Sequence, residues 1–132
     1  MRNLLRSLAM SVAVLGMAAA PAQGPQVKNV MHDKLVHTQK ILEAVVTSDW
    51  GGLELQSREL EQLTRDPRWT VLRYPEYAVQ SAAFVRAVQV LHTAAVQRDL
   101  ERTPKAYAEV TFQCVGCHRY LARARVARVS TD

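Results

Sequence analysis

Apolar residues recur at steps of three and four along most of the chain, and this spacing is typical of amphipathic helices. It runs through residues 27–46, 53–64, 75–98 and 105–126. In the first segment, the stripe that we expect to be buried consists of Val27, Met31, Leu35, Thr38, Leu42 and Val45. The sequence has no Asn-Gly or Asp-Gly hairpin signal and no sustained alternation of apolar and polar residues. The pattern therefore predicts an all-α fold.

The breaks between these segments are short. Residues 48–52 separate the first two, and Pro67 follows the second. Pro75 suits the first turn of the third helix, because the N–H that proline lacks would have no partner there. Thr103 is predicted to cap the fourth helix, with Pro104 in its first turn. Four helices with short connections favour an antiparallel four-helix bundle.

The N-terminus has the pattern of a secretory signal peptide. Residues 1–22 begin with a basic stretch, continue with an apolar run and end in small residues, including Ala20 and Ala22. The alternative is an uncleaved membrane anchor, which needs about 20 apolar residues, more than this run contains. We expect cleavage after Ala22 and export to the periplasm. Residues 23–132 then form one domain without stable membrane insertion.

Near the C-terminus the chain reads Cys114-Val115-Gly116-Cys117-His118, the C-x-x-C-H signature of covalent c-type haem attachment. The two thiols add to the vinyl groups of one porphyrin, and the histidine binds its iron. On a helix the spacing i, i+3, i+4 places all three side chains on one face, which we expect to face the bundle interior. Haem attached to the C-terminal helix is therefore predicted.

Other uses of a C-x-x-C pair stay open at this point. It occurs in redox dithiols, in disulfides and as half of a zinc site. Redox dithiols normally lie in an α/β setting, and no βαβ pattern is present. A zinc site needs further ligands, and the chain has only two cysteines. The histidines His32, His37 and His92 lie far from them and lack paired ligand spacing.

Four helical segments with C-x-x-C-H near the C-terminus resemble the class II cytochromes c, the cytochrome c-prime type. The resemblance implies a four-helix bundle that holds one haem on its last helix, with the first helix supplying the distal side. It also allows a homodimer, since relatives with this layout often pair. The family commonly has an aromatic residue and an arginine three and four positions after the histidine. Here Tyr120 comes one position early and Arg123 one late, as in a divergent member.

The functional hypotheses differ in the second protein ligand of the iron. Met31 is the candidate, because it lies on the predicted stripe and is the only methionine left after signal cleavage. His32 and His37 are the rival ligands. A methionine or histidine ligand indicates an electron carrier that works with redox partner proteins. The alternative is a five-coordinate haem that binds a small gas such as NO or CO, with Leu35, Phe84 and Val88 lining the distal pocket. Nothing in the sequence places an acid–base group at the iron, so we do not expect an enzyme.

The charge changes this picture little. The chain carries a formal charge of +5, which falls when the basic signal peptide leaves and when haem propionates are added. We therefore expect no nucleic-acid partner. Basic residues follow the motif at Arg119, Arg123, Arg125 and Arg128, as a solvated helix face or a docking patch for an acidic partner. Arg119, Arg123 and Lys34 are also candidate neighbours of the haem propionates.

Overall fold

The computed structural model describes residues 24–69 and 75–129, with side chains over 27–69 and 75–124. The elements are α1 (Gly24–Thr47), α2 (Trp50–Leu63), the short 3-10 helix η1 (Pro67–Trp69), α3 (Pro75–Val96) and α4 (Arg102–Val129). No strand occurs within the two described ranges. The prediction of an all-α fold with four helices is thus confirmed for this part of the chain. The predicted signal peptide, residues 1–22, lies outside it.

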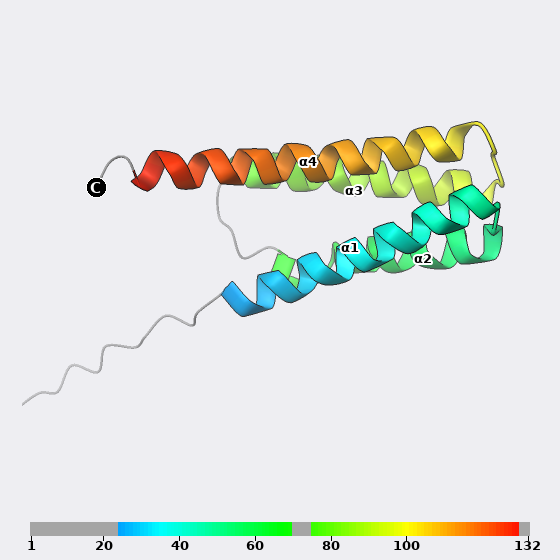
Figure 1. The fold of residues 1–132 in the computed structure, drawn as a ribbon, viewed down its shortest axis with the longest axis horizontal. Helices are drawn as coiled ribbons and strands as arrows, with labels where there is room; N and C mark the ends of the chain where they lie inside the picture. Colours follow the sequence, from blue (N-terminus) through cyan, green and yellow to red (C-terminus); the bar gives the residue numbers. More distant parts are fainter. Residues whose placement is uncertain (1–23, 70–74, 130–132) are drawn as a thin grey trace, which may run out of the picture.

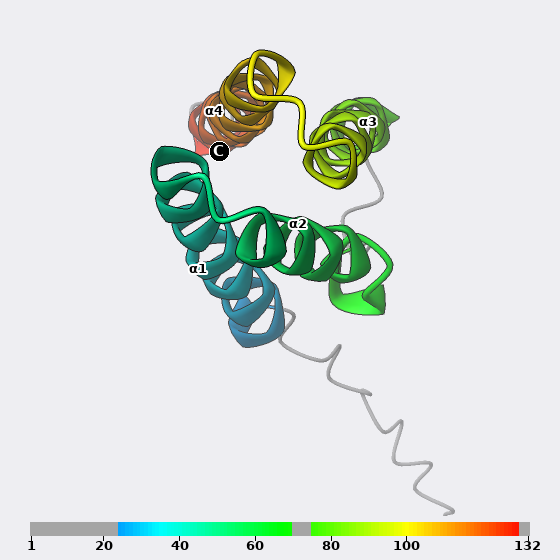
Figure 2. The same cartoon turned by 90° about the vertical axis from the view of Figure 1, so that its right-hand side faces the viewer.

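The helices lie in two layers, with α1 and α2 in one and α3 and α4 in the other (Figures 1 and 2). The chain turns back after α1 and again after α3 (Figure 1). Packing is extensive between α3 and α4, between α1 and α2, and between α2 and α3, whereas α1 and α4 make few contacts. In Figure 1 the ribbons of α1 and α4 also diverge toward the N-terminal end of α1. The junction between α1 and α4 is therefore weaker than the junctions of α1 with α2, α2 with α3 and α3 with α4.

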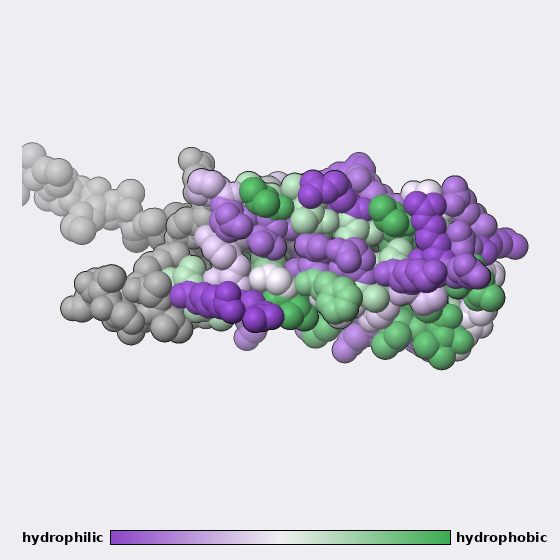
Figure 3. Space-filling model, turned by 90° about the horizontal axis from the view of Figure 1, so that it is seen from above, coloured by the Kyte–Doolittle hydropathy of each residue, from purple (hydrophilic) through white to green (hydrophobic). Residues whose placement is uncertain are grey.

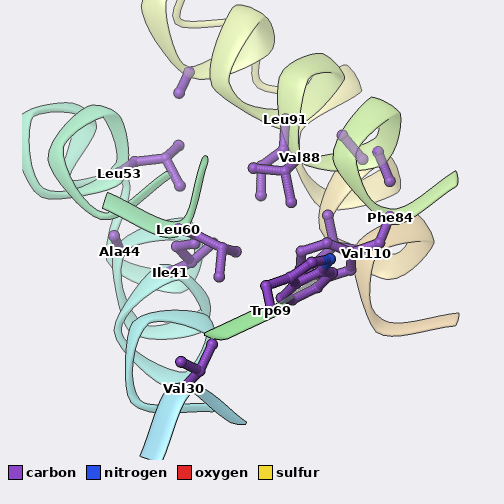
Figure 4. Close-up of a cluster of buried hydrophobic side chains, with 13 residues drawn as sticks. Val30, Ile41, Ala44, Leu53, Leu60, Trp69, Phe84, Val88, Leu91 and Val110 are labelled. Atoms are coloured by element: carbon purple, nitrogen blue, oxygen red, sulfur yellow. The ribbon is translucent and has the colours of Figure 1, made fainter. Parts of the chain in front are cut away.

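A single hydrophobic core fills the space between the layers (Figure 4). Each fully buried aliphatic side chain contributes roughly 1.5–3 kcal/mol relative to an exposed one. The largest of these side chains are Ile41, Leu53, Leu60, Leu91, Val30, Val88 and Val110. Outside the core the surface is mixed, and Figure 3 shows apolar atoms scattered among polar ones on one face.

The predicted buried stripe of the first helix is only partly right. Met31 and Val45 are half-buried against the core, but Leu35 and Leu42 are 55% and 46% exposed. The core side of α1 instead carries Val30, Ile41 and Ala44, all buried. The reason is that α1 has apolar residues on two adjacent faces, and its packing in the fold, mainly against α2, buries the face that carries Ile41.

Both tight turns use the same chemistry. Ser48 and Arg98 adopt positive φ angles of 56° and 52°, and each is followed by an aspartate whose N–H closes the preceding helix. The N–H of Asp49 donates to the Ala44 carbonyl at 2.9 Å, and that of Asp99 donates to the Ala94 carbonyl at 3.0 Å. This is the Schellman arrangement, here without glycine.

The same two aspartates open the next helices. The Asp49 carboxylate accepts from the Gly52 N–H at 3.0 Å, and the Asp99 carboxylate accepts from the Arg102 N–H at 2.8 Å. The predicted cap at Thr103 is therefore wrong, since α4 begins at Arg102 and the Thr103 hydroxyl donates to the Asp99 carbonyl. Likewise α2 begins at Trp50, so the predicted break at residues 48–52 is shorter than expected.

Candidate functional site

The C-x-x-C-H motif lies within α4. Cys114 and Cys117 are half-buried, and Cys114 packs against the hydrophobic core, whereas His118 is exposed. The expectation that all three face the interior is correct for the thiols and wrong for the imidazole. Around a helix, the positions i+3 and i+4 differ by about 100°, so turning the sulfurs inward turns the histidine outward.

The other side of α4 is occupied by α3. Gln113 lines a groove that α3 and α4 share, and a Cβ built on Gly116 would lie 3.7 Å from Oε1 of Gln80 in α3. His118 lies about 140° around the helix from Gln113, away from α3. No side-chain hydrogen bond or ion pair to His118 occurs among the described residues. The imidazole can therefore bind a metal without disturbing the packing of α3 on α4.

A charged side chain of α1 interacts with both thiols of the motif. Nζ of Lys34 lies 3.3 Å from the centre of the Trp69 ring and 3.8 Å from that of Phe84. Lys34 also interacts electrostatically with Cys114 and Cys117. Burial lowers the pKa of Lys34 from 10.5 to about 8, although the two thiols oppose this shift.

The thiols respond in the opposite sense. Burial raises the pKa of both Cys114 and Cys117, while the Lys34 ammonium works against the rise. Because the thiolate is the reactive form, both cysteines are less reactive in this structure than a solvated thiol.

Aromatic side chains from η1 and α3 form a wall of the site. The rings of Trp69 and Phe84 pack with centres 5.3 Å apart at 35°, and Figure 4 shows both beside Val110 of α4. The Tyr77 hydroxyl donates to the Trp69 carbonyl at 2.6 Å, which ties η1 to α3. Burial raises the pKa of Tyr77, and Cys117 adds to the rise. The motif thus borders a rigid, largely apolar cluster.

The other side chains considered as iron ligands differ in their surroundings. Met31 packs against the core, and His32 is exposed. His37 faces α2, where its Nδ1 lies 2.8 Å from Oε1 of Gln56. On α3, Nδ1 of His92 lies 3.0 Å from the Ser57 hydroxyl. Of these residues, Met31 packs against the same core cluster as Cys114, whereas His37 and His92 are paired with side chains of α2.

The residues predicted to line the distal pocket and to form a basic patch are only partly where the sequence places them. Phe84 and Val88 are buried, but Leu35 points into solvent, so it does not line the core in this structure. Arg119 and Arg123 are exposed on α4. The side chains of Arg125 and Arg128 lie outside the described residues.

Lys34 is the site residue whose placement the apolar pattern missed. Its signal is positional, since it lies four residues after Val30 and seven before Ile41, on the buried side of α1. A search for apolar residues at helical spacing does not detect a lysine among the buried positions of a helix.

Within the described ranges, no group of three or more His, Cys, Asp or Glu side chains could hold a free metal ion. A haem makes a smaller demand on the protein, because the porphyrin supplies four of the iron's ligands. Two half-buried thiols on one helix face and a free imidazole beside them fit that demand. None of the described helices is both long and apolar enough to cross a membrane.

Comparisons of the chain with family models, with curated proteins and with solved structures find no significant match.

Proposed function

We propose that the chain is a c-type cytochrome that carries single electrons through one covalently attached haem. The observation that supports this most is the arrangement of the motif on α4. Both thiols are half-buried, Cys114 against the apolar cluster, while the adjacent imidazole is exposed and without a side-chain partner among the described residues. The proposed fold is an antiparallel four-helix bundle with the haem attached to α4.

Each motif residue has its own task in this proposal. Cys114 and Cys117 hold the porphyrin through thioether bonds, and His118 binds the iron. When bound, the haem supplies a one-electron couple. Trp69, Phe84 and Val110 keep water from the inner side of the site, which weakens solvation of charge there.

The pKa directions speak against a redox dithiol. Dithiol oxidoreductases work through a thiolate whose pKa is lowered, whereas burial raises the pKa of both cysteines here. A zinc site is disfavoured too, because the His, Cys, Asp and Glu side chains of the described part of the chain form no group of three or more that could hold a free metal ion.

The proposed location is the periplasm. Covalent haem is attached outside the cytoplasmic membrane in bacteria, and residues 1–22 have the pattern of a signal peptide that directs export. We propose redox proteins as the partners. The exposed Arg119 and Arg123 offer an acidic partner a positive surface beside the motif.

A second iron ligand from the protein, besides His118, would decide between the electron carrier and a five-coordinate haem that binds NO or CO. Met31 is the candidate that the sequence supplies, and a thioether there would raise the reduction potential relative to a second histidine. Met31→Leu tests this directly, because it removes the sulfur and keeps an apolar side chain of similar volume.

A spectroscopic experiment tests the function as a whole. The full chain is produced in a host that attaches haem, and its absorption is measured in both oxidation states with and without CO. An electron carrier gives low-spin bands, a reversible one-electron titration and no ready binding of CO. High-spin bands with immediate CO binding would instead support the gas-binding alternative.

The matched variants identify the attachment site. Cys114→Ser with Cys117→Ser should abolish covalent haem, because no thiol remains to form a thioether. Val115→Ala changes the exposed residue between them and should leave haem content unchanged. Haem retained by the double variant, through denaturation, would contradict attachment at this motif.

A further inference from the structure

Lys34 occupies a position that is unusual for a lysine. The two other described lysines of α1, Lys28 and Lys40, are exposed, whereas Lys34 is half-buried on the core side of the helix. It shares that side with Val30 and Ile41, which are fully buried. Its long side chain therefore runs inward, toward α4.

The surroundings of its ammonium group do not compensate its charge well. Contacts with the faces of Trp69 and Phe84 are favourable for the ammonium group. They do not replace the solvation that a charge loses when it leaves water without a counter-ion, and no carboxylate pairs with Lys34 among the described side chains. Fold stability alone thus does not explain a lysine here.

Its position relative to the motif is the second observation. Nζ of Lys34 lies over the rings of Trp69 and Phe84, which belong to the core cluster that Cys114 packs against. The charge of Lys34 also interacts with Cys114 and Cys117, the two sulfurs that the proposed haem would join. Of the other α1 side chains able to bind iron, His32 is exposed and His37 faces Gln56 of α2. Met31 packs against the same cluster as Cys114, but its thioether carries no charge that interacts with the two sulfurs. Lys34 is therefore the α1 donor that reaches the attachment face.

We propose that the amine of Lys34, and not the thioether of Met31, is the second protein ligand of the haem iron. The inference rests on the proposed function, because it needs haem at Cys114 and Cys117. On binding, the ammonium releases its proton to solvent, and the freed nitrogen lone pair forms the bond to iron. The uncompensated positive charge inside the protein is removed by the same step.

The test uses the haem-loaded full chain and a set of matched variants. Lys34→Leu removes the nitrogen and keeps an apolar side chain, and Lys34→Arg keeps the positive charge on a group that cannot deprotonate to bind iron. Lys40→Leu is the control, since it removes an exposed lysine of the same helix. Circular dichroism establishes that each variant is folded, and electron paramagnetic resonance with near-infrared magnetic circular dichroism identifies the iron ligands.

The proposal expects a low-spin wild type with two nitrogen ligands. Lys34→Leu and Lys34→Arg should both lose that signature and become high-spin, while Lys40→Leu and Met31→Leu should keep it. Because Lys34→Arg preserves the charge, its loss of the signature separates iron binding from a salt bridge to a haem propionate.

Three results would overturn the proposal. A thioether signature that disappears in Met31→Leu would assign the ligand to methionine, and a high-spin wild type would leave the position open. A low-spin signature that persists in Lys34→Arg would show that Lys34 acts only as a charge near the haem and does not bind the iron. A chain without covalent haem contradicts the proposed function itself and is recognised separately, by the absence of any haem absorption.

Discussion

At the residue scale, Lys34 is the side chain that distinguishes this structure from an ordinary helical core. The repeat of α1 places position 34 between Val30 and Ile41, where an apolar residue would be stable without any compensation. Burial lowers its pKa to about 8, below the 10.5 of a solvated lysine. Between these two values the unfolded chain binds a proton that the folded chain lacks, so the free energy of unfolding rises with pH.

The pH dependence of the free energy of unfolding gives a prediction for the haem-free chain. In that chain, Cys114→Ser and Cys117→Ser remove both the haem and the thiols that interact with Lys34. Adding Lys34→Leu in this background should raise the free energy of unfolding, by about 2 to 3 kcal/mol at pH 7. The advantage should shrink as the pH rises from about 8 to 10.5, because the folded chain no longer carries the buried charge, and it should level off above 10.5, where the lysine is neutral in both states.

Urea unfolding at a series of pH values measures this difference, with Lys40→Leu as the exposed control. The control should change the stability little and show no such pH dependence. A Lys34→Leu effect that stays constant from pH 7 to 10.5 would contradict a buried, titrating lysine.

At the element scale, the two turns explain where the helices begin and end. Each combines a residue at positive φ, Ser48 or Arg98, with a following aspartate that caps the next helix. The left-handed conformation costs a residue with a side chain roughly 1–2 kcal/mol, and glycine avoids that cost. Replacing the residue at positive φ in either turn with glycine should therefore increase the stability.

Arg98→Gly should therefore raise the free energy of unfolding by about 0.5–1 kcal/mol, since it relieves the positive φ without touching the cap. Its matched control is Gln97→Gly, one position earlier, where φ is not positive and glycine should lower the stability. Thermal unfolding of the three proteins gives the order, and equal melting temperatures for both variants would contradict the assigned turn.

The aspartate that follows provides the opposite test. Asp99→Ala removes the acceptor of the Arg102 N–H and should lower the free energy of unfolding by about 1 kcal/mol. Glu101→Ala changes an exposed residue of the same turn and should have a smaller effect. If the two variants were equally stable in the same thermal scans, Asp99 would not be the cap.

At the scale of the whole molecule, the sequence predicts the four helices well, but it predicts less well which side of each helix is buried. Helical periodicity and proline positions identify each helix, because they depend on local steps along the chain. Which side of α1 is buried depends on its partners, because apolar residues lie on two adjacent faces of the helix. The periodicity predicts Leu35 and Leu42 in the core, but both are exposed and Ile41 is buried instead.

The candidate site shows the same division. The motif identifies Cys114, Cys117 and His118, because its chemistry is contained in five consecutive residues. The aromatic wall of Trp69 and Phe84 joins η1 to α3 across the fold, and no local pattern predicts that contact. The inward direction of Lys34 follows only once the packing of α1 is known.

The most direct measurement of the central claim is the intact mass of the exported protein from a host that attaches haem. We predict the mass of residues 23–132 plus one haem, unchanged by denaturation, because thioether bonds to Cys114 and Cys117 survive unfolding. A colourless protein with the mass of the bare polypeptide would contradict the account.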